Sequence, residues 1–170
     1  TFPVALRSVL RQDPDVIAIG EMRDEITAHI ACHAALTGHQ VYSTIHTANA
    51  VQTITRLSEM GVKPYVIASA LTFIISQRLV HKLCPFCSTD PPKVISKRGQ
   101  KNNVCPHCLG KGVKGRIVIA EILEIDSDIK TLIRERASEK TILDRAIQNG
   151  FKPLLVDIDT KVRQGHIKPY

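Results

Sequence analysis

Short apolar runs alternate with helical patterns over the first half of the chain. Two runs rich in β-branched residues, Asp15–Ile19 and Val41–Ile45, are bounded by turn residues, which is typical of buried parallel strands. Apolar residues at helical spacing, with Asp, Pro or Gly near the expected ends, fill the intervening segments. The predicted helices are Val4–Gln12, Asp24–Leu36, Ala50–Met60 and Pro64–Gln77. This order of elements predicts an α/β fold with a parallel sheet.

The pattern changes after Leu83. Cys, Pro, Gly, Lys and Asn dominate the segment Cys84–Gly115, which has too few apolar residues to bury a core and needs another source of stability. Beyond it Arg116–Ile125 alternates like a strand, and three helical patterns follow: Asp126–Arg136, Ser138–Gln148 and Pro153–Gln164. We therefore predict three parts: half of an α/β core over 1–83, an inserted cysteine subdomain over 84–115, and a strand with a helical subdomain over 116–170.

The overall composition, 44% hydrophobic and 23% charged, is typical of a folded globular domain. No apolar run reaches the roughly 18 residues that span a bilayer, and the strongest one, Val66–Ile75, is interrupted by polar residues. The chain begins on an apolar-periodic segment without a Met and without the features of a signal peptide. We expect it to be a piece of a larger protein.

The formal net charge is +7, and basic residues gather around the cysteines. They are Arg78, Lys82, Lys93, Lys97, Arg98, Lys101, Lys111, Lys114 and Arg116. Two interpretations stay open for this surface. It is either a solvated basic face, or a face that meets an acidic partner, nucleic acid or anionic lipid.

Two Cys-x-x-Cys pairs form the most specific chemical motif. They are CPFC, with Cys84 and Cys87, and CPHC, with Cys105 and Cys108. Two such loops direct four thiolates at one centre, which predicts a structural zinc site with no open position for water. Three alternatives remain: a redox pair, disulfides, and a site in which His107 replaces one cysteine. The twin motif disfavours the first and the missing signal peptide the second. Cys32, on an Ala-rich helix, is predicted to be an inert buried thiol.

Polar residues follow both predicted strands, at the edge where parallel sheets bind ligands. Glu21 and Arg23 come after the first strand, and Thr44 and His46 come at the end of the second. In nucleotide hydrolysis a carboxylate at this place orients the attacking water or reaches the Mg²⁺ shell. Each motif also has a structural interpretation, with Glu21 as a solvated charge at a helix start and Thr47 as a helix cap beside a satisfied histidine. Because polar motifs follow two neighbouring strands, the ligand-binding interpretation is favoured over the structural one.

A second cluster of polar residues lies on one predicted helix. Glu25, His29 and His33 are spaced four residues apart, a spacing that can chelate a metal ion. No further ligand in the sequence supports this interpretation, so we do not expect a metal there.

In this order the motifs resemble those of the secretion ATPases of type II secretion and type IV pilus assembly, which are related to conjugation and type IV secretion motors. The similar stretches cover nearly the whole chain. They include LRSVLRQDPDVIAIGEMRD, TAHIACHAALTGHQVYSTIHTANA, ITRLSEMGVKPY, ISQRLVHKLCPFC, CPHCLGKGVKGR and EILEID. The resemblance implies the C-terminal part of a RecA-like P-loop ATPase domain with an inserted zinc subdomain and a C-terminal helical subdomain.

The resemblance also implies roles for single residues. AIGEMRD is similar to the Walker B segment, which implies that Glu21 is the catalytic glutamate, and STIHTANA is similar to the histidine box, in which His46 would link the γ-phosphate to motion. The side chains expected on the nucleotide side are Arg7, Arg11, Arg23 and Thr44, with Arg7 and Arg11 near phosphates or the subunit boundary. The cysteines are similar to a zinc subdomain found in assembly and type II members and lacking in retraction motors.

The chain departs from this family in having no G-x-x-x-x-G-K-[ST] motif, so the amides and the Lys that cradle phosphates are missing. We expect that motif, with the acidic box and the arginine-finger domain, upstream of Thr1. The full-length protein is then expected to hydrolyse ATP with Mg²⁺, and the present chain alone to be inactive. The resemblance further implies a cytoplasmic homo-hexamer at the bacterial inner membrane that acts on a platform protein.

A rival hypothesis is a zinc-ribbon module that binds nucleic acid, suggested by four thiolates among basic residues. Phe86 is the one aromatic residue of the cysteine region, and stacking on bases needs more. Nucleic acid is therefore not the expected partner.

Overall fold

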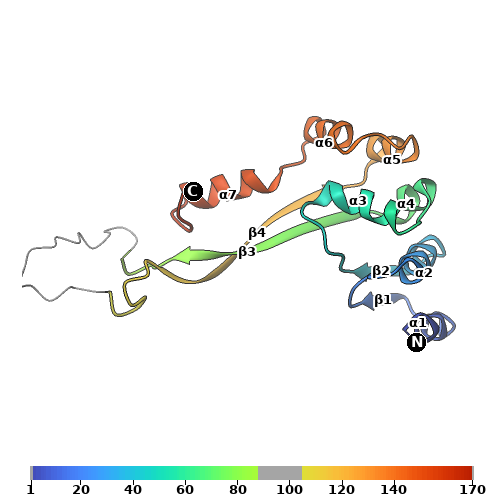
Figure 1. Cartoon of the computed structure of the whole chain (residues 1–170), viewed down its shortest axis with the longest axis horizontal. Coiled ribbons are helices and arrows are strands. Elements are labelled where there is room, and N and C mark those ends of the chain that lie inside the picture. Colours follow the sequence, from blue (N-terminus) through green and yellow to red (C-terminus); the bar gives the residue numbers. More distant parts are fainter. Residues whose placement is uncertain (1, 88–104, 170) are drawn as a thin grey trace, which may run out of the picture. The chain divides into compact units, whose positions relative to one another are not determined.

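The computed structural model describes residues 2–87 and 105–169 (Figure 1). The chain divides into two compact units. The first is Thr1–Ser76 with Glu121–Lys152, and the second is Gln77–Ala120 with Pro153–Tyr170. Two long strands, β3 (Phe73–Leu83) and β4 (Val113–Glu124), pair with each other and contribute residues to both units.

A small parallel sheet lies at the N-terminal side of the first unit. Its strands are β1 (Val16–Ile19) and β2 (Gln40–Ser43), in a register that places Ile19 opposite Ser43, which confirms the predicted parallel pairing. The prediction that both strands are buried is wrong for β2, whose residues are exposed or half-buried. The helices α1 (Phe2–Leu10) and α2 (Glu25–Leu36) pack here. Their shared core consists of Leu6, Ile17, Ile19, Ala31 and Ala34.

Local capping explains where the helices of this unit begin. The carboxylate of Asp24 accepts hydrogen bonds from the amide and the hydroxyl of Thr27, each at 2.8 Å, and so caps α2 as predicted. Asn49 caps α3 (Ala50–Glu59) in the same way through the amide of Gln52. Pro64 occupies the first turn of α4 (Pro64–Ala70), where its missing N–H costs nothing.

The main core of the first unit forms where these helices meet α5 (Ser127–Arg134) and α6 (Glu139–Gln148). Its most deeply buried large side chains are Leu57, Val62, Ile67, Leu123 and Ile129. The helical patterns predicted on both sides of the cysteine segment therefore fold against each other, although more than fifty residues separate α4 from α5.

One predicted element is wrong. The helix expected to run from Pro64 to Gln77 ends at Ala70, and β3 begins at Phe73. Leu71 already has the extended backbone of a strand, with φ −81° and ψ 136°. The following aromatic and β-branched residues favour extended structure, and Ile74 is buried while Ile75 is exposed, as in a strand. The apolar run is therefore helix and strand in succession.

The second unit combines the outer parts of β3 and β4 with α7 (Leu154–Arg163). Ile119, Ile158 and Ile167 form its buried cluster, with Val80 and Val162 packed against it. Two hydrogen bonds tie the chain end to the strands: the amide of Leu83 donates to the His166 carbonyl at 2.8 Å, and the amide of Ala120 donates to Asp157 at 2.9 Å.

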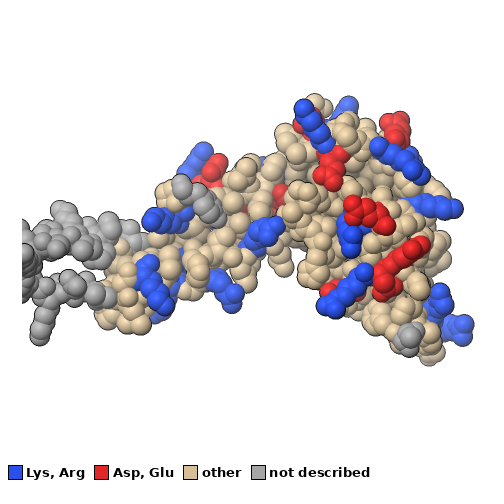
Figure 2. All heavy atoms as spheres, viewed as in Figure 1, with Lys and Arg blue, Asp and Glu red and all other residues tan. Residues whose placement is uncertain are grey.

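Charges are distributed differently over the two units. Figure 2 shows basic and acidic side chains interspersed over the helices of the first unit. The described part of the second unit carries Arg78, Lys82, Lys111, Lys114, Arg116, Lys161, Arg163 and Lys168 against Asp157 and Asp159. The other basic residues of the predicted basic surface, Lys93, Lys97, Arg98 and Lys101, lie outside the described residues. Over 2–87 and 105–169, no helix has the length and apolar character needed to cross a membrane.

Candidate functional site

The segments that follow β1 and β2 are held together by hydrogen bonds. The hydroxyl of Thr44 donates to the Gly20 carbonyl at 2.6 Å, and the amide of Met22 donates to the Thr44 carbonyl at 2.9 Å. Because these bonds continue the parallel pairing past the ends of both strands, they place the two predicted polar motifs at one edge of the sheet.

Glu21 is the centre of this edge. The guanidinium of Arg23 lies 2.6 Å from its Oε1, and Nε2 of His46 lies 3.2 Å from its Oε2. The hydrogen bond from Arg23 is the main reason that the pKa of Glu21 falls below its ordinary value, and His46 adds to the shift. The Glu21 side chain is 31% exposed, against 75% for Arg23 and 86% for His46. The site therefore presents an ionised carboxylate that water can reach, between two potential cations.

The loop that carries His46 is anchored at its far end. The hydroxyls of Thr47 and Thr53 lie 2.9 Å apart, and the amide of Ala50, the first residue of α3, donates to the Glu121 carboxylate at 2.7 Å. Glu121 is only 5% exposed. The sequence prediction missed Glu121. The alternation of the strand could have indicated its burial, because Glu121 lies on the same face of β4 as the buried residues Ile119 and Leu123.

The predicted arginines of the first helix lie elsewhere on the first unit. Arg7, on α1, lines an open pocket of about 500 Å³ together with His29, His33 and His39 of α2 and the turn after it. Within the described residues no hydrogen bond or ion pair joins Arg7 or Arg11 to Glu21. Any role of these arginines toward phosphate is therefore separate from the Glu21 contacts.

The two histidines of α2 contact each other, and His29 also contacts Glu25. The rings of His29 and His33 are stacked with centroids 6.4 Å apart, and the Glu25 carboxylate lies 3.8 Å from His29. Among the described residues the group with metal-binding geometry is the set of four cysteines.

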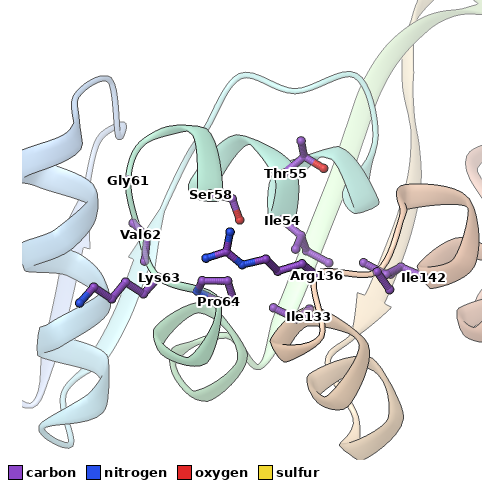
Figure 3. A pocket seen from close by; sticks show the side chains of 11 residues that line it. Ile54, Thr55, Ser58, Gly61, Val62, Lys63, Pro64, Ile133, Arg136 and Ile142 are labelled. Atoms are coloured by element: carbon purple, nitrogen blue, oxygen red, sulfur yellow. The ribbon is translucent and has the colours of Figure 1, made fainter.

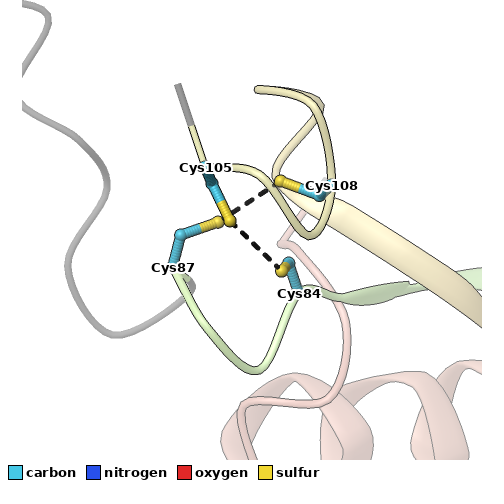
Figure 4. Close-up of side chains that lie close together, drawn as sticks. All are labelled: Cys84, Cys87, Cys105 and Cys108. Carbon is cyan, nitrogen blue, oxygen red and sulfur yellow. Dashed lines mark hydrogen bonds between the residues drawn. The ribbon is translucent and has the colours of Figure 1, made fainter. Parts of the chain in front are cut away.

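Those four cysteines converge at one end of the β3–β4 pair, with Cys84 and Cys87 just after β3 and Cys105 and Cys108 just before β4 (Figure 4). All their sulfurs lie within 4.8 Å of one another, with Cys84 and Cys105 4.0 Å apart and Cys87 and Cys108 3.5 Å apart. Four thiolates at about 2.3 Å from a zinc ion would lie roughly 3.8 Å apart, so the observed spacing fits a tetrahedral metal site. All five cysteines of the chain are free thiols in the structure.

The thiols of this cluster differ in acidity. Hydrogen bonding to Cys108 is the main cause that raises the pKa of Cys87 to about 12. Burial alone would raise the pKa of Cys108, but the amide of Gly112, at 3.3 Å from its sulfur, and the neighbouring thiols lower it to about 7. Cys108 is therefore the more acidic of these two thiols, and a metal ion binds cysteine as the deprotonated thiolate.

His107 and Cys32, the two other residues considered as ligands or reactive groups, both have defined surroundings. The ring of His107 stacks on Phe86 with centroids 3.6 Å apart, and the Lys114 ammonium lies 5.7 Å from the Phe86 centroid. His107 is thus part of a ring stack and does not belong to the four-sulfur group. Cys32 is buried as predicted, and burial raises the pKa of its thiol to about 11, which makes it unreactive at neutral pH.

Comparison with known proteins places the chain in a family. The family model described as type II/IV secretion system protein matches residues 1–168. The chain is 41% identical over 165 residues to the type II secretion system protein HxcR of Pseudomonas aeruginosa, covering 97% of this chain and 34% of that protein. It is 43% identical over 179 residues to the type IV pilus assembly ATPase PilB of Thermus thermophilus, covering 97% of this chain and 20% of that protein.

Solved structures of a pilus retraction motor and of an ATPase have a similar fold. The pilus retraction motor PilT with bound ADP is 31% identical and superposes with a TM-score of 0.72, covering 99% of this chain and 41% of that one. The ATPase DotB of Legionella pneumophila, 23% identical, shares the fold with a TM-score of 0.70, covering 99% of this chain and 40% of that one. The predicted α/β class is therefore confirmed.

The chain belongs to the type II/IV secretion system protein family, as its sequence motifs indicated. It spans between 20% and 35% of the length of the first curated relatives that it matches. The nucleic-acid hypothesis is not favoured, because the matches extend over almost the whole chain and not over the cysteine segment alone.

Proposed function

We propose that this chain is the C-terminal part of a RecA-like ATPase core, in a hexameric motor that drives type IV pilus assembly or type II secretion by hydrolysing ATP. The observation that carries the proposal is the Glu21 carboxylate, held between Arg23 and His46 at the end of a parallel strand pair. An ionised carboxylate at this edge is the group that phosphoryl transfer needs to orient the attacking water.

In this mechanism each residue of the strand-end site has a separate role. Glu21 accepts a hydrogen bond from the water and aligns it, while Arg23 keeps the carboxylate ionised. His46 contacts Glu21 from the neighbouring strand, so a change at the γ-phosphate that moves either side chain is passed to the loop leading into α3. The Thr44 hydroxyl holds the two strand ends in register, and Arg7 and Arg11 are proposed to act at the phosphates or the subunit boundary.

Nucleotide binding itself requires groups that this sequence does not contain. No phosphate-cradling G-x-x-x-x-G-K-[ST] motif occurs in the 170 residues. ATP and Mg²⁺ are therefore proposed to bind the full-length protein, and the chain alone is proposed to be inactive. Mg²⁺ would neutralise charge on the transferred phosphate, and Glu21 is the carboxylate of this chain placed to reach its water shell.

We further propose that the four cysteines hold one structural zinc ion. The supporting observation is that the four sulfurs lie within 4.8 Å of one another, with separations of 3.5 and 4.0 Å across the two pairs. Four sulfurs leave no open position for water, so the ion supplies stability and not catalysis. In the proposed division of the protein, 84–115 is this zinc subdomain, between an ATPase part at 1–83 and a strand with helices at 116–170.

The partners proposed for the whole protein follow from the same family. They are five further copies of the protein in a hexamer, and a platform protein of the inner membrane, reached from the cytoplasmic side. The basic side chains of the second unit, such as Lys111 and Lys114, are a suitable face for an acidic partner.

The test is the substitution Glu21→Gln in the full-length protein. Gln keeps the shape of the side chain but removes the charge, so ATP hydrolysis should fall at least a hundredfold while nucleotide affinity stays the same. Glu25→Gln, an exposed carboxylate at the start of α2, is the matched control and should retain full turnover. Normal turnover by Glu21→Gln would refute the proposed role.

A further inference from the structure

A cavity of about 320 Å³ opens in the first unit between four helices (Figure 3). Its lining includes Ile54 and Ser58 of α3, Pro64 of α4, Ile133 of α5, Arg136 just past α5, and Ile142 of α6. The volume is at the lower end of the roughly 300–1,000 Å³ that small-molecule sites occupy. None of the proposed nucleotide or zinc residues lines it.

Arg136 has an unusual backbone conformation. Its φ is +55°, in the left-handed region that ordinarily favours glycine. It occupies the position directly after the C-cap of α5, in a two-bond motif: the Arg136 amide donates to the Ile133 carbonyl at 3.1 Å, and the Ala137 amide donates to the Leu132 carbonyl at 3.0 Å. A long charged side chain at a place that suits glycine points to a use for that side chain.

The direction of the side chain indicates the use. In Figure 3 the Arg136 side chain extends across the pocket toward Ser58, whereas the Lys63 ammonium points away from it. Within the described residues the Arg136 guanidinium makes no hydrogen bond or ion pair, and the hydrogen bond of this residue is that of its backbone amide. The carboxylate of Glu139, on α6, already accepts a hydrogen bond from the Thr55 hydroxyl at 2.7 Å. The pocket thus combines one unpaired cation with branched aliphatic walls.

We propose that this pocket binds a carboxylate attached to a branched aliphatic group, such as the end of a peptide that terminates in Leu or Ile. The planar guanidinium of Arg136 can donate two parallel hydrogen bonds to a carboxylate, and the Ser58 hydroxyl can donate a third. The side chains of Ile54, Ile133 and Ile142 provide the apolar surface for the aliphatic group. A phosphate group would need more cations around it and would make no favourable contact with the apolar side chains of the pocket. This binding is independent of ATP hydrolysis.

The experiment uses two matched probes that differ only in charge, N-acetyl-L-leucine and N-acetyl-L-leucinamide. Each is titrated into the whole 170-residue chain, and amide chemical shifts are followed by NMR. N-acetyl-L-leucine should produce saturable shifts at Ser58, Ile133 and Arg136, and the uncharged amide should bind at least about tenfold more weakly, because it loses the charge-assisted hydrogen bonds. Equal binding of the two probes, or no binding by either, would overturn the proposal.

The decisive variant is Arg136→Gly, because glycine accepts the positive φ without strain and the fold is retained. It should lose the preference for the carboxylate, with a thermal unfolding temperature equal to or above that of the unchanged chain. Arg134→Gln, on the last turn of α5 and outside the pocket, should bind as the unchanged chain does. Undiminished binding of N-acetyl-L-leucine by Arg136→Gly would overturn the proposal.

A third probe, N-acetyl-Ala-Ala-Leu, distinguishes the source of the carboxylate. If this tripeptide binds more tightly than N-acetyl-L-leucine, the result supports the site and identifies a peptide C-terminus as its ligand. Equal binding also supports the site and identifies a free small aliphatic acid.

Discussion

The imidazole Nε2 of His46 lies 3.2 Å from Oε2 of Glu21, although the two residues are 25 positions apart in the chain. The parallel pairing of β1 with β2 causes this contact, because it brings the ends of both strands to one edge of the sheet. On the other side of the same carboxylate, Arg23 lies 2.6 Å away. The ionisation of Glu21 therefore depends on residues from two strands, which can be tested directly.

Arg23→Gln should raise the pKa of Glu21 toward its ordinary value of about 4.3. Arg23 favours the ionised carboxylate, so its removal makes protonation easier, and His46→Asn should produce a smaller rise in the same direction because His46 is the lesser cause. The measurement is a ¹³C NMR titration of the Glu21 carboxyl group. Arg11→Gln is the control and should leave the pKa of Glu21 unchanged. An unshifted pKa in Arg23→Gln would contradict the geometry described above.

Cys105→Ser should lower the zinc content of the purified chain from one ion to well below one. The hydroxyl is a far weaker zinc ligand than a thiolate, and the sequence around the cysteines contains few apolar residues that could stabilise it without the ion. Elemental analysis and thermal unfolding, each with and without a chelator, measure both effects. Cys32→Ser, outside the cluster, should keep the full zinc content. A metal-free chain with unchanged unfolding would argue against a structural ion.

Glu121→Ala should destabilise the first unit by about 1–3 kcal/mol, because it removes the acceptor for a buried amide at the start of α3. Urea denaturation followed by circular dichroism gives the free energy of unfolding. Glu124→Ala, an exposed carboxylate on the same strand, should change it by less than about 0.5 kcal/mol. Similar values for the two variants would show that the Ala50 contact contributes little.

Protonation of Asp157 should make the second unit less stable in acid. Its hydrogen bond with Lys161 is the main cause that lowers its pKa, and the Ala120 amide adds to this. A carboxyl group whose pKa is lower in the folded state stabilises the fold above its unfolded value of about 3.9, and that contribution is lost as the pH falls through the folded pKa. We expect a loss on the order of 1 kcal/mol, since the pair is partly solvated.

The measurement for Asp157 is thermal unfolding between neutral pH and about pH 2. Asp157→Asn should be less stable at neutral pH and show a flatter dependence on pH in the acidic range. Asp159→Asn, two positions away and exposed, should follow the unchanged chain. A profile for Asp157→Asn that parallels the unchanged chain would count against this assignment.

Sequence reasoning was most successful where neighbouring residues decide the structure. Asp24 caps α2, Pro64 opens α4, and β1 lies in its predicted apolar run, because caps and short strands depend on a few adjacent positions. It was wrong about the segment after Ala70. There the same apolar residues suit a helix or a strand, and pairing with β4, a strand far along the chain, decides for the strand.

By itself the sequence determined the cysteine motif, the polar residues at the strand ends and the family, because each rests on residue types at short, definite spacings. Tertiary structure alone decided which distant groups meet. It placed His46 on Glu21, buried Glu121 against the Ala50 amide, and directed Arg136 into an aliphatic pocket. These contacts arise from strand pairing and helix packing between segments far apart in the chain, and no local pattern encodes such distances.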